Sequence, residues 1–357
     1  MIRAVIALAI GAAPLLAVPP GELRAQTACP RPTIALAPAE QWDPARGGHP
    51  LVGTVLKGAE PLAPAVGDAC AAAPIEQLRQ AITAHLQEGG VVLLGEMHDN
   101  GLQHALRAEL LRAAAAALTE GGRQRPPALV FEHIRTDQAA ALEQRAGSNS
   151  ESARDLLERL DWKNSGWPPA ELFLPIFEVA VAGRLPILPG HPSRAEVRDV
   201  SRRGLAALPA DTVARLGLDQ PLPDALASAL LDELEASHCG LMPRTAFTNM
   251  ALAQRYRDAH LAAALMEAAD KHGSAILLAG NGHVRTDRGV PWDLARMAPK
   301  RKVLSVLLSE VMDGRTDTTA YVMRDPSGKP AADFVVLTPR AARPDPCEAM
   351  RAHFKKQ

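Results

Sequence analysis

Short apolar segments alternate with segments of helical periodicity along most of this chain. Residues 91–94 (VVLL) and 128–131 (ALVF) are apolar runs of strand length, and helical spacing of apolar residues follows at residues 102–118 and 136–145. Strands that are joined through a helix usually pair in parallel. The alternation therefore predicts an α/β fold with a mainly parallel sheet flanked by helices.

A long helical region interrupts this alternation. After a predicted strand at residues 185–189, residues 193–271 contain several helical stretches separated by prolines and no strand-like run. The sheet then resumes with three apolar runs, at residues 275–279, 303–308 and 334–337. We therefore predict one α/β domain over residues 75–348, with an inserted all-helical cap subdomain at residues 193–271.

The first 25 residues have the pattern of a signal peptide. Arg3 precedes an apolar run at residues 4–18, which is too short to span a bilayer comfortably, and Ala25 offers a small residue for cleavage. We expect a mature chain that begins near Gln26 and is periplasmic or otherwise exported. Lipid anchoring is not expected, because the residues before Cys29 are not a small and aliphatic stretch.

The segments outside the predicted domain show little apolar periodicity. Residues 26–74 form a lead-in rich in Pro, Ala and Gly with one strand-like stretch at residues 50–56, and residues 349–357 form a C-terminal tail.

Four cysteines in an exported chain allow three pairings. We favour Cys29–Cys70, which would tie down the lead-in, and Cys239–Cys347, which would attach the tail to the body. The alternative is that one or more are free buried thiols.

The charge distribution argues against nucleic acid as a partner. The chain has 39 Lys and Arg against 40 Asp and Glu residues, a formal net charge of −1, and its basic residues are scattered rather than gathered into a stripe. It has only 2 Tyr residues, so platforms for stacked bases are scarce. A small molecule is the more plausible ligand.

Four predicted strands are each followed within a few residues by Glu or His side chains. These side chains are Glu96 and His98, Glu132 beside His133, His191, and His283. In open α/β sheets, ligands bind outside the carboxyl ends of the strands. If the strands are parallel, these side chains converge at one edge of the sheet.

Two carboxylates and three imidazoles support two kinds of chemistry. As metal ligands, Glu96, His98, Glu132, His191 and His283 would suit zinc, manganese or iron. Without a metal, a His oriented by a Glu could act as a general base, with Glu96, His98, Glu132 and His283 as the catalytic set. The residues alone do not separate these alternatives.

Each member also has a structural explanation. Glu96 could cap the following helix, Glu132 could pair with an arginine, and His191 could mark a turn before Pro192. His133 should point away from Glu132, because neighbouring strand residues face opposite sides. A loop at residues 161–168 contains Trp162 and Trp167, which would either form an apolar wall of the pocket or fill the core. We expect His104, His238 and His260 to be ordinary packing or surface residues.

Several motifs together resemble a known family. They are GEMHDN from residue 95, FEH from 131, WKNSGWP from 162, HCGLMP from 238, GNGHVRTDRGVP from 280 and DPC from 345. In number and order they are similar to those of the ChaN-like haem-binding family, over roughly residues 50–348. That family is grouped with the erythromycin esterase and TIKI/TraB proteins, which share a pair of Gly-x-x-His motifs, here Gly95 to His98 and Gly280 to His283.

The resemblance implies a haem- or iron-binding protein of the cell envelope that takes part in haem or iron uptake. Haem would be the cofactor, an envelope or outer-membrane uptake protein a partner, and a homodimer is a possible assembly. Either one of the histidines or Tyr256 would be the haem ligand. The site would be lined by Trp162 and Trp167, and Arg285 would lie near the propionates.

Two functional hypotheses follow, and both use the same edge of the sheet. Haem binding predicts an apolar slot between the cap and the sheet, with His98, His191 or His283 at the iron. The relatives that hydrolyse their substrates suggest instead an esterase or peptidase, with or without a divalent metal. That alternative predicts a narrower polar pocket in which Glu96, His98, Glu132 and His283 lie within hydrogen-bond or metal distance.

Overall fold

The computed structural model describes residues 48–63, 73–122, 125–143 and 151–354. The predicted signal peptide, most of the lead-in, the pairing of Cys29 with Cys70 and the last three residues of the tail lie outside these ranges.

The described residues contain one eight-stranded sheet with the order β2-β1-β8-β7-β3-β6-β4-β5. The strands are β1 (Val55–Lys57), β2 (Glu60–Pro61), β3 (Val91–Leu94), β4 (Ala128–Arg135), β5 (Ile187–His191), β6 (Ala275–Leu278), β7 (Val303–Glu310) and β8 (Phe334–Thr338). The six strands from β3 to β8 pair in parallel, and β1 and β2 add an antiparallel edge. The predicted mainly parallel α/β fold is confirmed.

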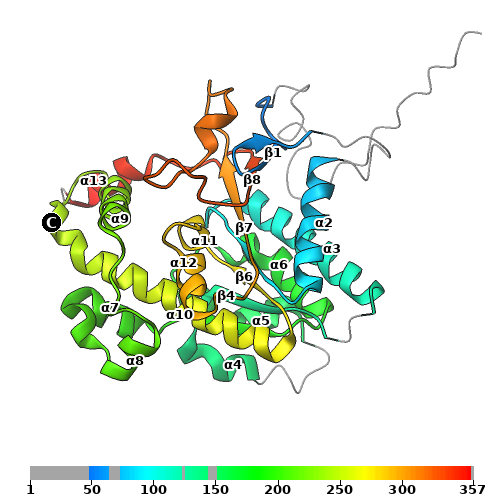
Figure 1. Ribbon diagram of the computed structural model, residues 1–357, viewed down its shortest axis with the longest axis horizontal. Coiled ribbons are helices and arrows are strands. Elements are labelled where there is room, and N and C mark those ends of the chain that lie inside the picture. The colour runs from blue at the N-terminus through cyan, green and yellow to red at the C-terminus, as the bar shows by residue number, and fades with distance from the viewer. Residues whose placement is uncertain (1–47, 64–72, 123–124, 144–150, 355–357) are drawn as a thin grey trace, which may run out of the picture.

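Helices cover both faces of this sheet (Figure 1). One face packs against α2 (Pro74–Gln87), α3 (Gly101–Glu120), α5 (Ala153–Arg159) and α6 (Ala170–Ala182), and the other packs against α10 (Thr248–His272) and α12 (Val290–Met297). Along β3, Val92 and Leu94 face the first group while Val91 and Leu93 face the second. The central strands are uniformly apolar because both of their faces are buried.

Residues 194–272 are helical in the structure, as the proline-broken pattern predicts. They contain α7 (Arg194–Arg203), α8 (Ala210–Arg215), α9 (Asp224–Ser237) and α10, with short 3-10 turns between them, and this fully described stretch has no strand. Val197, Val200, Leu216 and Tyr256 form a small core of their own. The first half of α10 contributes to this small core, and its second half packs against the sheet.

Four strands, β4, β5, β7 and β8, extend beyond their predicted ends, and the extensions of β4 and β5 carry candidate site residues. β4 continues from Phe131 through Arg135, and β5 continues through His191. Arg135 pairs with His191 after a shift in register, so each strand supplies the backbone partners that keep the other extended past its apolar run. The extension brings Glu132, His133 and His191 into the sheet itself.

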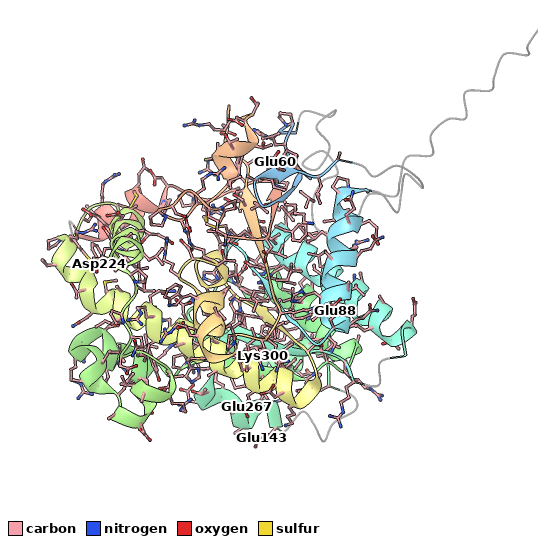
Figure 2. All side chains as sticks on the ribbon, in the orientation of Figure 1. Glu60, Glu88, Glu143, Asp224, Glu267 and Lys300 are labelled. Carbon is pink, nitrogen blue, oxygen red and sulfur yellow. A yellow bond between two sulfur atoms is a disulfide. The ribbon has the colours of Figure 1, made fainter. Side chains whose placement is uncertain are left out.

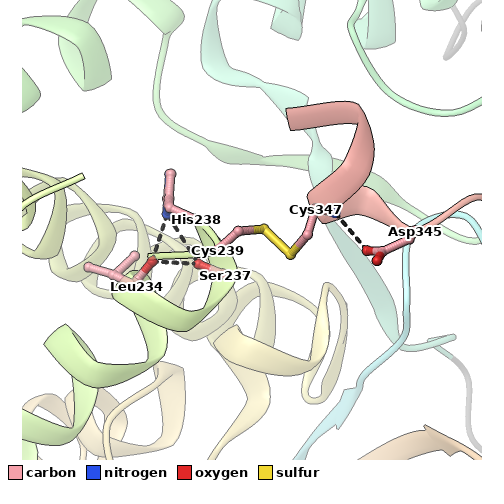
Figure 3. The surroundings of a disulfide bond; sticks show 6 residues. All are labelled: Leu234, Ser237, His238, Cys239, Asp345 and Cys347. Atoms are coloured by element: carbon pink, nitrogen blue, oxygen red, sulfur yellow. Dashed lines mark hydrogen bonds between the residues drawn. A yellow bond between two sulfur atoms is a disulfide. The ribbon is translucent and has the colours of Figure 1, made fainter. Parts of the chain in front are cut away.

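Shorter helices complete the chain, and the tail is cross-linked to the cap. These helices are α4 (Ala139–Glu143), α11 (Asn281–Val284) and α13 (Pro346–Phe354). The predicted Cys239–Cys347 disulfide is confirmed: it joins the turn after α9 to the start of α13, with a Cα–Cα distance of 5.6 Å (Figure 3). No helix in the described part of the chain is long and apolar enough to cross a membrane.

Most charged side chains lie on the outside of the molecule. Figure 2 labels Glu60, Glu88, Glu143, Asp224, Glu267 and Lys300, all of which are exposed. A small number of charged groups are buried instead, among them Glu96, Arg107, Glu132, Asp258 and His283. Buried charges need partners, so these residues direct attention to the carboxyl edge of the sheet.

Candidate functional site

The buried charges form two linked groups around the carboxyl ends of β3, β4 and β6. The first group is Glu96, His98, His104, Arg107 and His133, on the side of α3 and α6. The second is Glu132, His283 and Asp258, on the side of α10 and α11. The predicted convergence at this edge is therefore seen for Glu96, His98, Glu132 and His283.

Glu96 is the centre of the first group and is 1% exposed. Its Oε1 lies 2.6 Å from His98 Nδ1 and 3.0 Å from His133 Nε2. Its Oε2 lies 2.9 Å from His104 Nε2 and 3.3 Å from Arg107 Nη2, contacts that are electrostatic rather than well-directed hydrogen bonds. Burial disfavours the charge of Glu96, but Arg107 and His104 outweigh burial and hold the pKa of the carboxyl well below its usual range.

Arg107 also fixes the tautomer of His104. The guanidinium Nη2 lies 2.9 Å from His104 Nδ1, and arginine can only donate, so Nδ1 accepts and Nε2 carries the proton. That Nε2 proton faces both the backbone oxygen of His98, at 2.9 Å, and Glu96. Arg107 thus orients one of the histidines that surround the buried carboxylate.

His98 connects the two groups. Its Nδ1 is held by Glu96, while its Nε2 lies 4.0 Å from Glu132 Oε1, too far for a direct hydrogen bond. The His98 side chain is 38% exposed, against 0% for His104 and His133. Burial lowers the pKa of His98, but the hydrogen bond to Glu96 and the charge of Glu132 more than compensate and raise it.

Glu132 and Asp258 hold His283 from both sides in the second group. His283 Nδ1 lies 2.6 Å from Asp258 Oδ1 on α10, and its Nε2 lies 3.2 Å from Glu132 Oε1. The other oxygen of Glu132 accepts a hydrogen bond of 2.7 Å from the backbone amide of Gly280. Although burial acts against it, the two carboxylates raise the pKa of His283 to about 10.

The first glycine of each Gly-x-x-His motif makes room for a side chain of the other motif. A Cβ at Gly95 would lie 2.3 Å from Asn281 Oδ1, and a Cβ at Gly280 would lie 2.8 Å from His98 Cε1. Asn281 in turn donates to the backbone oxygen of Leu308 at 2.7 Å. The two motifs are therefore packed against each other, which explains why glycine is needed at both positions.

The raised pKa of His283 predicts a loss of stability at alkaline pH. Relative to the ordinary value of 6.5, a folded-state pKa of about 10 means that the ion pair stabilises the fold fully below pH 6.5 and is lost as the pH rises towards 10. Between pH 6.5 and 10, the free energy of unfolding, measured in urea, should fall by on the order of a few kcal/mol more for the wild type than for His283→Gln. An equal dependence of this free energy on pH in the two proteins would contradict the assignment.

His191 lies near the second group without joining it. Its Nδ1 donates to the backbone oxygen of Pro192 at 2.6 Å, and among the described residues no hydrogen bond or ion pair connects it to the carboxylates. Burial lowers the pKa of His191 to about 4, so the ring is neutral at pH 7. The structure therefore places His191 beside the site rather than within the predicted metal set.

Two predicted haem contacts lie elsewhere. Tyr256 is 2% exposed in the small core of the cap, where burial raises the pKa of its hydroxyl to about 12. Arg285 is buried and makes two hydrogen bonds to Asp287, of 2.9 and 2.6 Å. As folded, Tyr256 is buried with its hydroxyl beside Glu196, and Arg285 is already paired with Asp287, so neither is presented to a ligand.

The tryptophan loop serves both of the purposes considered for it. Trp162 is buried, donates to the backbone oxygen of Pro168 and packs on Phe173, as core. Trp167 is half-buried and contacts the rings of His98 and His133, with centroid distances of 4.8 and 4.7 Å. Both line a surface cavity of about 680 Å³, whose rim also carries Arg154 and Lys163.

Sequence reasoning missed Asp258, Arg107 and the roles of His104 and His133. As predicted, His133 faces away from Glu132. On that side it contacts Glu96 of the first group as well as the core residue Phe173. His104 and Arg107 lie one turn apart on α3, a spacing that could have indicated a shared face towards Glu96. Nothing in the local sequence marks Asp258, because its partner is contributed by a distant segment.

A metal ion could be held by part of the first group. Glu96, His98 and His133 each offer a ligand atom, and these atoms all lie within 4.8 Å of one another. One carboxylate and two imidazoles suit zinc, manganese or iron. This set shares only Glu96 and His98 with the predicted metal ligands, and it adds His133.

Solved structures with a similar fold are known. A structure described as cofacial haem binding to ChaN of Campylobacter jejuni matches with a TM-score of 0.53 and 18% identity, over 72% of this chain and 90% of that chain. A mutant of the erythromycin esterase EreC in its open conformation matches with a TM-score of 0.41 and 14% identity, over 75% of this chain and 95% of that chain. No curated protein sequence matches.

The family itself is shown by a sequence model rather than by these structures. The model described as "Haem-binding uptake, Tiki superfamily, ChaN" matches residues 82–294, which is more than half of the chain and includes both Gly-x-x-His motifs. The chain therefore belongs to the ChaN family of haem-binding uptake proteins in the Tiki superfamily.

Proposed function

We propose that this protein binds haem at the carboxyl edge of its sheet, with His98 as the iron ligand. The observation that carries the proposal is the state of the His98 ring: Nδ1 is held 2.6 Å from a buried carboxylate, and the ring is the exposed member of the cluster. A carboxylate on Nδ1 fixes the tautomer and orientation of a histidine and makes its Nε2 a stronger ligand. Such a histidine is a common ligand of haem iron.

The surroundings of His98 suit a flat apolar ligand. Trp167 packs against the ring, and Met97, next to His98, is 40% exposed. Trp167 also lines the cavity of about 680 Å³, whose volume is within the range of small-molecule sites. Arg154 and Lys163 line the same cavity, whereas none of the Glu and His residues of the cluster does.

We further propose that the protein acts in the periplasm, or otherwise outside the cytoplasm, in haem or iron uptake. The N-terminal sequence pattern supports export. The Cys239–Cys347 disulfide is consistent with an oxidising compartment. An uptake role would require an envelope partner that delivers or receives haem.

Haemin titration of the purified, metal-stripped mature protein tests the proposal. The wild type should give a saturable, shifted Soret band, and His98→Ala should weaken binding at least about 100-fold, because replacing even the outer partner of a metal-bound histidine costs 10–100-fold. His272→Ala, at the far end of α10 next to the start of β6, is the matched control and should bind normally. Equal affinity of wild type and His98→Ala would exclude His98 as the ligand.

A hydrolytic function is the second candidate, and a different observation favours it. Ligation of iron by His98 does not require the Asp258–His283–Glu132 arrangement, whereas an enzyme could use such a chain to hold and move a proton. The titration discriminates the two candidates: absence of any specific haem band would favour the hydrolase. The next measurement would then be calorimetric titration of the protein with a divalent metal, which tests binding at Glu96, His98 and His133.

A further inference from the structure

The segment between β8 and α13 crosses the carboxyl edge of the sheet as a strap, which we define as residues 339–347, including the first two residues of α13. At its start, the backbone oxygen of Pro339 accepts a hydrogen bond of 3.0 Å from Asn100 Nδ2. Two residues later, the amide of Ala341 donates to Glu310 Oε1 at 3.0 Å. At its end, Cys347 is bonded to Cys239 of the cap (Figure 3). The strap is therefore anchored both to the sheet and to the cap.

Arg343, in the middle of the strap, binds two carboxylates at once. Its Nε and Nη2 donate to Asp99 at 2.6 and 2.8 Å, and its Nη1 and Nη2 donate to Glu310 at 2.6 and 2.5 Å. Both contacts are bidentate, the geometry in which arginine is most specific. The Arg343 side chain is 18% exposed and that of Glu310 is 11% exposed, so the bonds to Glu310 are partly shielded from solvent, whereas the Asp99 side chain is 43% exposed.

The two carboxylates belong to the framework of the proposed haem site. Asp99 is adjacent to His98, and Glu310 is the last residue of β7, which pairs with β3. Asn100, the next residue along, is fully buried, caps α3 and donates to Glu310 at 2.6 Å. Arg343 thus ties the loop that carries His98 to a fixed strand and to the strap.

We infer that Arg343 is a positioning residue for the haem site, because the strap holds the His98 loop in place through its two bidentate contacts. The inference rests on the proposed function for its effect on haem, but the restraint on the loop is a property of the protein alone. Without the guanidinium, Asp99 and Glu310 lose the cation between them, although Asn100 and the amide of Ala341 still donate to Glu310. The loop between β3 and α3 then loses the link that Asp99 makes to the strap. His98 then samples orientations that do not suit the iron.

Hydrogen exchange and haem titration of Arg343→Gln test this inference together. In the haem-free protein, amides of residues 96–100 should exchange faster, and haem affinity should fall about tenfold, the lower end of the range for partners of a metal ligand. The electron paramagnetic resonance spectrum of the ferric complex should broaden as His98 becomes less uniformly oriented. Arg340→Gln, which removes an exposed arginine of the same strap, should change none of these quantities.

Two further variants separate positioning from general stability. Arg343→Lys keeps the charge but cannot make two bidentate contacts, so it should give an intermediate loss of affinity. Adding Asp99→Asn to Arg343→Gln should produce little extra effect, because both changes break the same contact.

Unchanged exchange and affinity in Arg343→Gln would overturn the inference, and so would fully additive effects of the two substitutions. If the wild type bound no haem, the proposed function would fail. The exchange measurement would still decide whether Arg343 restrains the loop.

Discussion

Arg107→Met should lower the free energy of unfolding by roughly 3–5 kcal/mol, the range for removing one partner of a buried ion pair. Arg107 is 1% exposed and is among the largest fully buried side chains of the molecule. Its guanidinium faces Glu96, which has no access to water that could stabilise its charge. Without Arg107, the carboxylate must either remain buried with weaker compensation or take up a proton. Urea unfolding, followed by tryptophan fluorescence, measures the loss.

Two controls distinguish this effect from the loss of packing. Arg112→Met removes an exposed ion pair with Glu109 on the same helix and should cost less than about 1 kcal/mol. Adding Glu96→Gln to Arg107→Met should recover part of the lost stability, because it removes the uncompensated charge. If Glu96→Gln lowers the free energy of unfolding by the same amount in Arg107→Met as it does in the wild type, the two residues are not coupled.

Replacing both cysteines of the Cys239–Cys347 disulfide by serine should lower the free energy of unfolding by about 2–5 kcal/mol. The bond closes a loop between residues 108 positions apart, so its loss frees a long segment of the unfolded chain. It also leaves α9 weakly held, since Leu230 is the buried residue of that helix. Thermal or urea unfolding of the purified variant under non-reducing conditions measures the change. An unfolding midpoint equal to that of the wild type would contradict a stabilising role.

The sheet could be predicted from sequence because its strands are short, uniformly apolar runs followed by conspicuous polar residues. Residues 91–94 and 275–278 form strands within one residue of the prediction. The ends of β4 and β5 could not be predicted, because a polar segment such as Glu132 to Arg135 is extended only through pairing with its neighbour. Strand extension of this kind depends on tertiary contacts rather than on local propensity.

The candidate site was predictable in its strand-end residues and not in its helical ones. Glu96, His98, Glu132 and His283 each follow an apolar strand run in the sequence, and parallel strands bring such positions to one edge. Asp258 and Arg343 reach the site from a cap helix and from the strap, respectively, through contacts between residues far apart in sequence. Hydrophobic periodicity carries no information about which polar residue of a helix or loop meets a particular partner.

The geometry also assigns different tasks to residues that look alike in the sequence. His98 and His283 occupy the same position in two Gly-x-x-His motifs, yet His98 is exposed beside one carboxylate and His283 is buried between two. In the first arrangement Nε2 has no hydrogen-bond partner among the described residues, whereas both nitrogens of His283 lie beside carboxylates. This asymmetry is the basis for assigning the iron to His98.

Imidazole rescue of His98→Gly tests that assignment most directly. The substitution removes the side chain and leaves a space that free imidazole can enter, beside Glu96 and Trp167. We expect the His98→Gly haem complex to lose the shifted Soret band of the wild type and to regain it when imidazole is added. A His98→Gly protein that binds haem with the wild-type spectrum, before any imidazole is present, would contradict the account.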